Sequence, residues 1–434
     1  MSAPAFDTVA RVFAPDALGT TVRLRGWVLR TRSSGGILFM ALRDRTGVVQ
    51  VTGRRDALGD AAYEAAEHVQ IEGAVSVEGT VAEDRRAPEG REIRASRITV
   101  IDSGEPFPIF SDQTEEFRLD KRHLTIRSQE NVAIFRVKAE LLRAFREFLD
   151  REEVVEMTPP IISGNAAEGG AEAFQIDYFG RPGYLSQSAQ LYLEALLFPH
   201  ERVYSLTSAF RAEKSRTTRH ITEFLMLEVE LAWCDLAGLL DFTERMMVST
   251  VHAVASRRPK ELTALGRRPE ELLAITAPFE RVRYAEAIDR LSKLGFPVHF
   301  GSDIATAEER ALTLESHSPL FVTHFPRELK AFYMLRSTDD PRTVEAADLL
   351  GSEGYGEIVG ASCRETDIAR LTERIVETGA KVEEYEWYLD LRRHGSVPHA
   401  GFGLGIERVL RWMLRREHIR DTTPFPRTPS RHTP

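Results

Sequence analysis

Residues 210–224 of the chain read FRAEKSRTTRHITEF, and residues 225–231 continue as LMLEVEL. An apolar run ends at Arg211, a loop rich in Arg and Thr follows, and the second run alternates apolar residues with carboxylates. This pattern predicts a β-hairpin. An arginine at a strand end can hold a phosphate through two hydrogen bonds, and a basic loop beyond it can contact the end of a nucleic acid. For an isolated match, an exposed hairpin with solvated charges is the alternative.

Two more stretches of unusual composition lie on either side of this hairpin in the chain. Residues 401–408 read GFGLGIER and lead into an apolar helical pattern, but their glycine spacing does not fit a dinucleotide-binding fingerprint. Small residues before an arginine suit a binding surface formed by backbone atoms, with the arginine side chain above it. Residues 156–160 read EMTPP and follow the amphipathic helical pattern of 131–153, which alone is ordinary helix termination.

In this order, EMTPP, FRAEKSRTTRHITEF and GFGLGIERVL resemble motifs 1, 2 and 3 of the class II aminoacyl-tRNA synthetases. With a β-rich N-terminal segment and PFPRTPSRHTP at 424–434, the chain resembles the aspartyl/asparaginyl subgroup over essentially its full length. The resemblance implies a ligase that activates an amino acid with ATP as its adenylate and transfers it to tRNA. It also implies an α+β catalytic domain and a homodimer formed through motif 1.

The resemblance assigns the residues of motifs 2 and 3 to ATP. Arg211 would bind the α-phosphate and Arg408 the γ-phosphate, and both would act in catalysis by positioning the reactants and neutralising charge at phosphorus. Glu213 would lie near the adenine amino group or the tRNA 3′ end. Phe224 would stack on the adenine, and His220 would make a further phosphate contact. No general base is needed, because the amino-acid carboxylate is already ionised.

The stretch EAADLLGSEGYGEI at 345–358 supplies the expected metal site. Asp348 and Glu357 match the acidic pair that binds Mg²⁺ bridging the ATP phosphates in this family. Carboxylate oxygens together with substrate phosphates are the ligands that Mg²⁺ prefers. Without the surrounding motifs, a solvated acidic loop would be the better interpretation of these two residues.

Two positions favour asparagine over aspartate as the substrate. In YLSQSAQLYLEA at 184–195, Leu193 stands where aspartyl enzymes have a Lys that pairs with the substrate carboxylate. A buried carboxylate facing Leu would lose about 3–5 kcal/mol of charge compensation. Glu228 stands where aspartyl enzymes have Asp, and it can accept a hydrogen bond from an amide while repelling a carboxylate. The expected substrates are therefore asparagine and tRNA(Asn).

Further residues complete the expected amino-acid site. Arg364, in GEIVGASCRE, matches the arginine that donates to the side-chain carbonyl in either subgroup. Ser188, Gln190 and Glu168 would face the amino end of the substrate. Cys363 departs from the Gln that the family commonly has there, which would loosen selectivity if that Gln belongs to the pocket. A small buried residue is favoured over a reactive or metal-binding cysteine at this position.

Residues 20–104 read as five short β runs separated by turns, with one helical stretch at 61–69. Five strands with an inserted helix predict an OB-fold, a small barrel whose face binds oligonucleotides. Any other small five-stranded barrel is the alternative. The predicted domains are the OB-fold at 1–104, a hinge rich in Pro and charge at 105–127, and a catalytic domain at 128–434.

The resemblance makes the barrel an anticodon reader. Phe39 would stack on the central anticodon base, and Gln50 would read the edge of that base. Arg30 and Arg32 are candidates for contacts with phosphates or bases. Stacking on an aromatic side chain contributes about 1–3 kcal/mol per base. A core aromatic at Phe39 and a surface strand residue at Gln50 are the structural alternatives.

The catalytic domain mixes strands and helices without regular alternation, which favours an α+β fold with an antiparallel sheet. Its segment 236–295 is mostly helical in pattern. The 434 residues include 42% hydrophobic residues, which suits a globular protein of two or three domains. No run reaches the roughly 18 apolar residues of a membrane span. Because no secretory leader is visible and two cysteines make no disulfide framework, we expect a cytoplasmic protein.

The net charge of −9 argues against nucleic-acid binding over the whole surface. Within residues 1–104, fourteen Arg balance fourteen Asp and Glu, and Lys does not occur. The chain has 50 Arg and 7 Lys, a bias that GC-rich coding explains for most positions. Individual arginines must therefore be judged by where they stand.

Three alternatives to an asparagine enzyme stay open. One is an aspartyl-tRNA synthetase, including one that charges both tRNAs, against which Leu193 and Glu228 argue. Another is a synthetase-like asparagine synthetase that needs no tRNA, against which the OB-fold argues. The last is a nucleic-acid-binding relative without catalysis, against which the complete set of Arg and carboxylate positions in the motifs argues.

Overall fold

The computed structural model describes residues 5–164, 173–214 and 217–434. The chain divides into two compact units, Met1–Thr114 and Glu115–Pro434, which are described separately below. The predicted hinge at 105–127 is shared between them. Its second half forms helices α4 (Glu115–Asp120) and α5 (Arg122–Thr125), which belong to the second unit.

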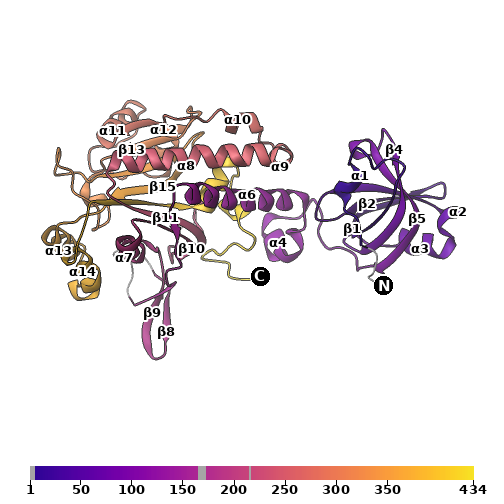
Figure 1. The fold of residues 1–434 in the computed structure, drawn as a ribbon, viewed down its shortest axis with the longest axis horizontal. Coiled ribbons are helices and arrows are strands. Elements are labelled where there is room, and N and C mark those ends of the chain that lie inside the picture. Colours follow the sequence, from indigo (N-terminus) through magenta and orange to yellow (C-terminus); the bar gives the residue numbers. More distant parts are fainter. Residues whose placement is uncertain (1–4, 165–172, 215–216) are drawn as a thin grey trace. The chain divides into compact units, whose positions relative to one another are not determined.

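The first unit is a closed barrel with strand order β1-β2-β3-β5-β4, which confirms the predicted OB-fold (Figure 1). Along β2 and β3, every second side chain is buried in the barrel and its neighbours face outward. The helical insertion between β3 and β4 is also present. The elements of this unit are α1 (Val9–Val12), β1 (Thr21–Ser34), β2 (Ile37–Arg43), β3 (Val48–Arg54), α2 (Arg55–Leu58), α3 (Asp60–Glu67), β4 (Ala74–Glu83), η1 (Pro88–Gly90) and β5 (Arg91–Asp102).

The second unit is built on an eight-stranded sheet with the order β12-β13-β14-β15-β16-β11-β10-β6. The predicted α+β class is confirmed, and the central strands pair antiparallel as expected. The outermost pairs, β12–β13 and β10–β6, are parallel, because long crossover segments separate their strands in the chain. The strands are β6 (Val155–Glu156), β10 (Arg202–Phe210), β11 (Glu223–Ala232), β12 (Glu280–Arg283), β13 (Leu320–Thr323), β14 (Ala346–Gly351), β15 (Gly356–Cys363) and β16 (His399–Gly405).

Two long helices, α6 (Gln129–Arg151) and α8 (Leu236–Arg257), run side by side across one face of this sheet (Figure 1). Each begins at a capping side chain: Ser128 accepts from the Asn131 amide, and Asp235 accepts from the Gly238 amide at 2.8 Å. Their apolar faces and the inward side chains of the sheet form the main hydrophobic core of the unit.

The remaining elements surround the sheet. A small sheet with the order β7-β9-β8 includes a hairpin that projects away from the large sheet (Figure 1). These elements are β7 (Ile162–Ser163), β8 (Gln175–Tyr178), β9 (Arg181–Leu185), α7 (Gln190–His200), α9 (Pro259–Ala264), α10 (Pro269–Leu273), α11 (Tyr284–Lys293), α12 (Thr306–Thr313), η2 (Arg327–Leu329), α13 (Ile368–Glu377), η3 (Val382–Tyr385), α14 (Glu386–Arg393), α15 (Ile406–Met413) and η4 (Ile419–Thr422). The predicted helical segment 236–295 thus contains four helices and the short strand β12.

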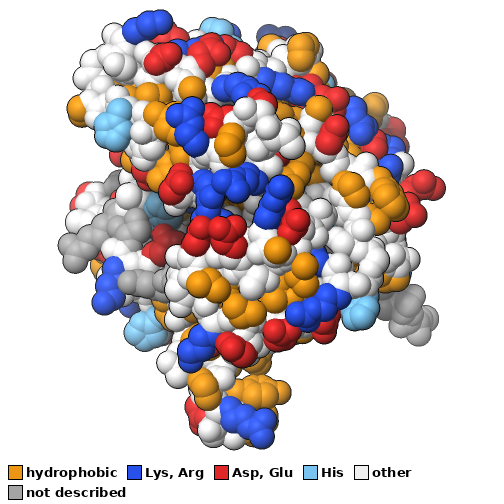
Figure 2. Space-filling model, turned by 90° about the vertical axis from the view of Figure 1, so that its left-hand side faces the viewer, with side chains coloured by type: hydrophobic (Ala, Val, Ile, Leu, Met, Phe, Trp, Pro, Cys, Tyr) orange, Lys and Arg blue, Asp and Glu red, His pale blue; other side chains and the backbone are white. Residues whose placement is uncertain are grey.

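Acidic and basic side chains are interspersed on the face drawn in Figure 2, and neither sign forms a continuous field. This mixture agrees with the sequence argument that nucleic-acid contacts must be local. Across the described residues, none of the helices combines the length and apolar character required to cross a bilayer.

Candidate active site

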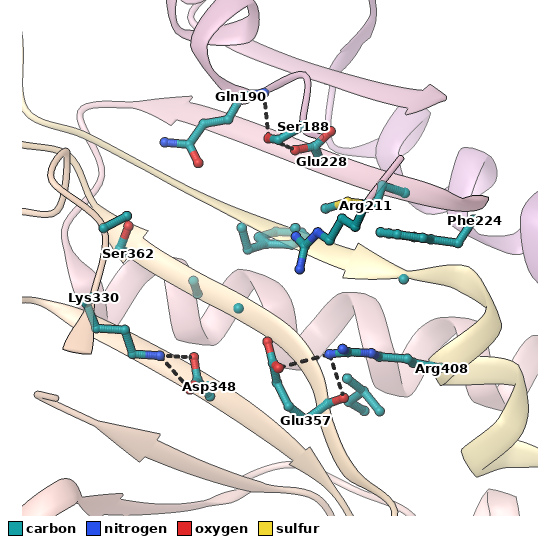
Figure 3. A pocket seen from close by; sticks show the side chains of 18 of the residues that line it. Ser188, Gln190, Arg211, Phe224, Glu228, Lys330, Asp348, Glu357, Ser362 and Arg408 are labelled. Atoms are coloured by element: carbon teal, nitrogen blue, oxygen red, sulfur yellow. Dashed lines mark hydrogen bonds and ion pairs between the residues drawn. The ribbon is translucent and has the colours of Figure 1, made fainter. Parts of the chain in front are cut away.

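A cavity of about 520 Å³ opens in the second unit, next to the strands β11, β15 and β16. Its lining contains most of the site residues predicted from the motifs, although they come from distant parts of the chain (Figure 3). They are Ser188, Gln190, Arg211, Glu213, His220, Phe224, Glu228, Asp348, Glu357, Arg364 and Arg408.

Arg211 stands where β10 ends, as the hairpin pattern predicts, and its backbone amide donates to Thr222 across the hairpin. In Figure 3 its side chain lies near the middle of the cavity, between Glu228 on one side and Arg408 on the other. The guanidinium carbon of Arg211 lies 5.6 Å from the centre of the half-buried Phe224 ring. The geometry places a cation and an aromatic face together, as a nucleotide site requires.

Arg408, at the start of α15, points into the cavity and contacts a predicted metal ligand. Its Nη1 donates to Glu357 Oε2 at 2.9 Å. Although burial opposes the charge of Glu357, Arg408, Lys330 and Arg211 hold its pKa well below the ordinary range. Glu357 is therefore ionised at neutral pH.

Asp348 and Glu357 point toward a common place beside Gly360. A Cβ atom added at Gly360 would lie 3.3 Å from Glu357 Oε1 and 3.9 Å from Asp348 Oδ1. Lys330, which the sequence did not single out, donates to both oxygens of Asp348 at 2.6 and 2.8 Å. Burial raises the pKa of Asp348 against the effect of Lys330, and Glu357 adds to the rise. Converging carboxylates of this kind fit a hard divalent cation.

His220 and Glu213 complete the lining on the side of the hairpin. His220 Nδ1 contacts the hydroxyl of Thr217. Burial, together with Arg408, Arg219 and Arg211, lowers the pKa of His220 to about 4. The imidazole is therefore neutral at pH 7 and can contact phosphate through an N–H without adding charge.

Glu228, on β11, is buried and faces Ser188 and Gln190 at the opposite end of the cavity (Figure 3). Its carboxylate accepts from the Ser188 hydroxyl at 2.5 Å and from the Ala189 amide at 2.8 Å. The Ser188 hydroxyl in turn accepts from the backbone N–H of Gln190 at 3.1 Å. These bonds fix Glu228 as an acceptor at the predicted amino-acid end.

Arg364 is also buried at this end, where it pairs with Glu230 through Nε at 3.2 Å and through Nη2. Its Nη1 donates to Ser362. Gly401 of β16 lies opposite Glu230 in the sheet, and a Cβ there would come within 2.2 Å of the Glu230 carboxylate. The glycines of the GFGLG stretch thus leave space for the carboxylates of β11.

Leu193 is the one predicted site residue of the described chain in this unit that the structure does not bring to the cavity. It is fully buried among Ala189, Leu197 and Val203, and it is not part of the cavity lining. Leu193 shares a helix face with Ala189 and Leu197, which stand four residues before and after it and belong to the same core cluster. Glu168 lies outside the described residues. Cys363 is buried in the main core, and burial raises the pKa of its thiol to about 12, which suits an inert packing residue.

Several residues near the cavity were not identified from the sequence. Lys330 and Glu309 lie in stretches without a recognisable motif, and tertiary folding alone brings them to Asp348 and to Arg219. Glu230 could have been identified from the sequence. It stands two residues after Glu228 in LMLEVEL, so both side chains lie on the same face of β11.

In the first unit, the four predicted anticodon residues share the outer face of neighbouring strands. Arg32 of β1 lies opposite Phe39 of β2, and its guanidinium carbon is 4.8 Å from the ring centre. Arg30 lies opposite Ala41, which in turn pairs with Gln50 of β3. Phe39 is half-buried while Arg30 and Arg32 are exposed, so a stacking surface and two cations are available to a ligand.

Comparison with known proteins places both units in described families. Residues 114–429 match the family described as tRNA synthetases class II (D, K and N). Residues 22–101 match the OB-fold nucleic acid binding domain.

Similar proteins cover nearly the whole chain. An asparagine–tRNA ligase of Thermococcus kodakarensis is 48% identical over 421 residues, which cover 97% of each protein. One of Thermoplasma acidophilum is 41% identical over 98% of this chain and 100% of its own length. The crystal structure of asparaginyl-tRNA synthetase from Pyrococcus horikoshii complexed with asparaginyl-adenylate superimposes with a TM-score of 0.96 at 45% identity. It covers 99% of this chain and 100% of that one.

Proposed function

The chain belongs to the class II tRNA synthetases of the D, K and N type, and from that premise we propose that it is an asparagine–tRNA ligase. It activates asparagine with ATP to asparaginyl-adenylate and transfers the asparaginyl group to tRNA(Asn). The observation that carries this conclusion is near-full-length similarity to asparagine–tRNA ligases together with Arg211, Arg408 and Glu228 in one cavity.

In the proposed reaction, the asparagine carboxylate attacks the α-phosphorus of ATP and pyrophosphate leaves. Arg211 neutralises the charge that develops at the α-phosphate, and Phe224 provides a face for the adenine. Arg408 binds the γ-phosphate after exchanging part of its contact with Glu357 for that phosphate. Positioning and electrostatics supply the catalysis, since the nucleophile is ionised without help from the protein.

We propose Asp348 and Glu357 as the residues that hold Mg²⁺ with the ATP phosphates. Their carboxylates converge beside Gly360, and carboxylate oxygens are ligands that Mg²⁺ prefers, which supports this assignment. When bound, the ion supplies neutralisation of phosphate charge. Lys330 donates to both oxygens of Asp348 and would share that carboxylate with the ion.

Asparagine recognition rests on a donor and an acceptor at the buried end of the cavity. Arg364 donates to the side-chain carbonyl, and Glu228 accepts from the side-chain amide. A substrate carboxylate placed against Glu228 would be repelled, which favours asparagine over aspartate. Leu193 has no part in this discrimination through direct contact, because it packs in the core. Ser188 and Gln190 face the amino end of the substrate.

The OB-fold unit binds the anticodon in this proposal. Phe39 stacks on the central base and Gln50 reads its edge, with Arg30 and Arg32 beside them. The Gln50 amide also donates to Glu92 at 3.1 Å, which holds the side chain in place on the strand. Because tRNA, ATP and amino acids meet in the cytoplasm, that is the proposed location.

We also propose a homodimer that forms through the surface around β6 and the small sheet. Several large apolar side chains are exposed there, and a monomer would leave them in water. They are Val155, Ile161, Ile162, Phe174, Tyr178 and Phe179, the last of which is 92% exposed. Light scattering behind size exclusion should give twice the chain mass, and a monomer at micromolar concentration would refute the proposal.

Amino-acid-dependent exchange of pyrophosphate into ATP tests the function. Asparagine should support exchange, and aspartate should be about 100-fold or more poorer in kcat/KM. Exchange with aspartate alone would instead establish an aspartyl enzyme. Free asparagine made from aspartate, ATP and ammonia would establish an asparagine synthetase.

A further inference from the structure

Glu194 is a charged residue at the centre of a fully enclosed polar cluster behind the amino-acid end of the cavity. It lies on α7, one residue beyond Leu193, and its side chain is inaccessible to solvent. It is absent from the cavity lining, so it does not touch a substrate in the cavity. A buried carboxylate of this kind is stable only when cations and hydrogen-bond donors compensate for its loss of hydration.

Helix α14 and strand β16 supply that compensation. Glu194 Oε2 accepts from Arg392 Nη2 at 2.7 Å, from the Tyr388 hydroxyl at 2.7 Å and from His399 Nε2 at 3.1 Å. Burial opposes ionisation, but Arg392, His399 and Arg364 hold the pKa of Glu194 below its usual range. Burial also keeps the pKa of Tyr388 high, so its hydroxyl remains a donor.

The cluster extends to two residues that do line the cavity. Gln190 Nε2 donates to Glu194 Oε1 at 3.1 Å. Arg364 Nε lies 3.9 Å from the same oxygen, close enough for a strong charge interaction in a buried site. Glu194 therefore acts on the substrate side of the cavity through Gln190 and Arg364.

The charges around Arg364 decide what it can bind. Glu230 already engages two nitrogens of Arg364, and Glu194 adds a second carboxylate beside it. With Glu228, three carboxylates surround this end, against the guanidiniums of Arg364 and Arg392. An aspartate side chain would bring a further carboxylate to this group of acidic residues, whereas an amide carbonyl needs only one N–H.

Arg364 retains donors for such a carbonyl. A guanidinium has five N–H groups, and the contacts with Glu230 and Ser362 in the described residues engage three of them. The remaining N–H groups belong to the two terminal nitrogens. Arg364 thus offers hydrogen bonds while much of its charge is already balanced.

We propose that Glu194 is a specificity-determining positioning residue, which fixes Gln190 and offsets the charge of Arg364 so that the site selects a neutral amide over a carboxylate. This inference rests on the proposed asparagine-activating function. It differs from a simple structural role, in which Glu194 would only join α7 to α14 and its loss would affect both amino acids equally.

The test substitutes Glu194→Gln, which keeps the shape and removes the charge. We measure kcat and KM of pyrophosphate exchange separately for asparagine and aspartate, and the melting temperature. The ratio of kcat/KM for asparagine to that for aspartate should fall about ten-fold or more, mainly through KM. A folded, active E194Q enzyme with an unchanged ratio would overturn the inference.

Two control variants separate charge from stability. Glu140 is also buried, on α6, where it pairs with Arg143, Arg257 and Arg258, and it is not part of the cavity lining. E140Q should lower the melting temperature and leave the amino-acid ratio unchanged. Tyr388→Phe removes a hydrogen bond from Glu194 but no charge, so its ratio should stay within about two-fold of wild type. An effect of Y388F as large as that of E194Q would contradict the charge argument.

Two further outcomes keep the test decisive. If E194Q does not fold, Glu194→Asp keeps the charge but withdraws it from Arg364, and the ratio should fall in the same direction by a smaller factor. An unchanged ratio in folded E194D would also overturn the inference. If the wild-type protein shows no exchange with asparagine, the proposed function itself fails, which is distinguishable from a failure at Glu194 alone.

Discussion

Individual charged residues of the cavity are held by partners that a substrate must displace or share. Arg408 contacts Glu357, and Lys330 contacts Asp348, so each of these two carboxylates is paired with a cation. Arg211 differs in packing its guanidinium over the ring of Phe224. The position of Arg211 between the two ends of the cavity makes it the residue whose removal should affect the chemical step most.

For Arg211→Ala, we expect kcat of adenylate formation to fall by about 10²–10³, since one preorganised charge at the transition state is lost. KM for asparagine should change little. Arg211→Lys should recover only part of the rate, because a point charge cannot replace two parallel donors. Single-turnover adenylate formation is the measurement. The control is R268A, which removes an exposed arginine directly before α10. A normal rate in R211A would rule out the assigned role.

His418 predicts a defined pH dependence of stability. Burial, together with Arg420 and Arg411, lowers its pKa to about 4, and its Nδ1 accepts from the Arg420 amide. The unfolded chain, with an ordinary histidine pKa near 6.5, binds a proton in this window that the folded chain does not. The free energy of unfolding should therefore decrease as the pH falls from about 6.5 toward 4.

The variant H418Q keeps an acceptor for the Arg420 amide and removes the titration. Denaturant unfolding at pH 7 and at pH 5 should show a smaller loss of stability in H418Q than in wild type. Equal losses would mean that His418 is not held neutral in the fold.

Among individual residues, the sequence predicted those whose role follows from their position in a local motif. Arg211 and Phe224 could be identified because they flank one hairpin, and the structure brings both to the cavity. Glu194 could not, because its partners Arg392 and His399 are 198 and 205 residues away in the chain. The resemblance assigned Leu193 to the amino-acid site, whereas the structure buries it in a core cluster outside the cavity lining.

The central element of the site is the pair β11–β16. Met226, Glu228 and Glu230 of β11 lie opposite Gly405, Gly403 and Gly401 of β16. A strand with glycine at every second position gives the longer side chains of its neighbour room to turn into the site. The alternation on β11 could be predicted from the sequence, whereas its pairing with β16, whose Gly401 follows Glu230 by 171 residues, could not.

This register predicts unequal effects of alanine along β16. A Cβ at Gly401 would lie 2.2 Å from Glu230 Oε1 and 2.4 Å from a backbone oxygen, so G401A should displace Glu230 from Arg364. The melting temperature should fall by several degrees and KM for asparagine should rise. In G405A the nearest atom would be 3.7 Å away, so its melting temperature should stay near wild type. Similar melting temperatures for the two variants would contradict the register.

The whole molecule consists of two compact units, to which the proposed function assigns different tasks. The barrel has the pattern that sequence alternation predicted, because each of its strands buries one face. The parallel edge pairs of the large sheet were not predicted, because they depend on crossovers that no local pattern records. An acidic chain that binds tRNA can do so through the few cations placed on β1 beside Phe39.

The division predicts that defects in the barrel affect only steps that need tRNA. Phe39→Ala should raise KM for tRNA(Asn) by about 10- to 100-fold, from the loss of stacking on one base. Pyrophosphate exchange without tRNA should be unchanged. Phe6, an exposed aromatic beside Arg25 on the same unit, gives the control variant F6A, which should charge tRNA normally. Loss of exchange in F39A would show that the units do not act separately.

The position of β16 has a consequence for how a cell makes this protein. β16 lies between β11 and β15, although it is formed by residues 399–405. Until a ribosome has released those residues, the two halves of the sheet have no strand to join them. Ile419 and Pro429, which also line the cavity, follow later still. During the second half of its synthesis, the nascent chain therefore already contains Arg211 but cannot yet use ATP or asparagine.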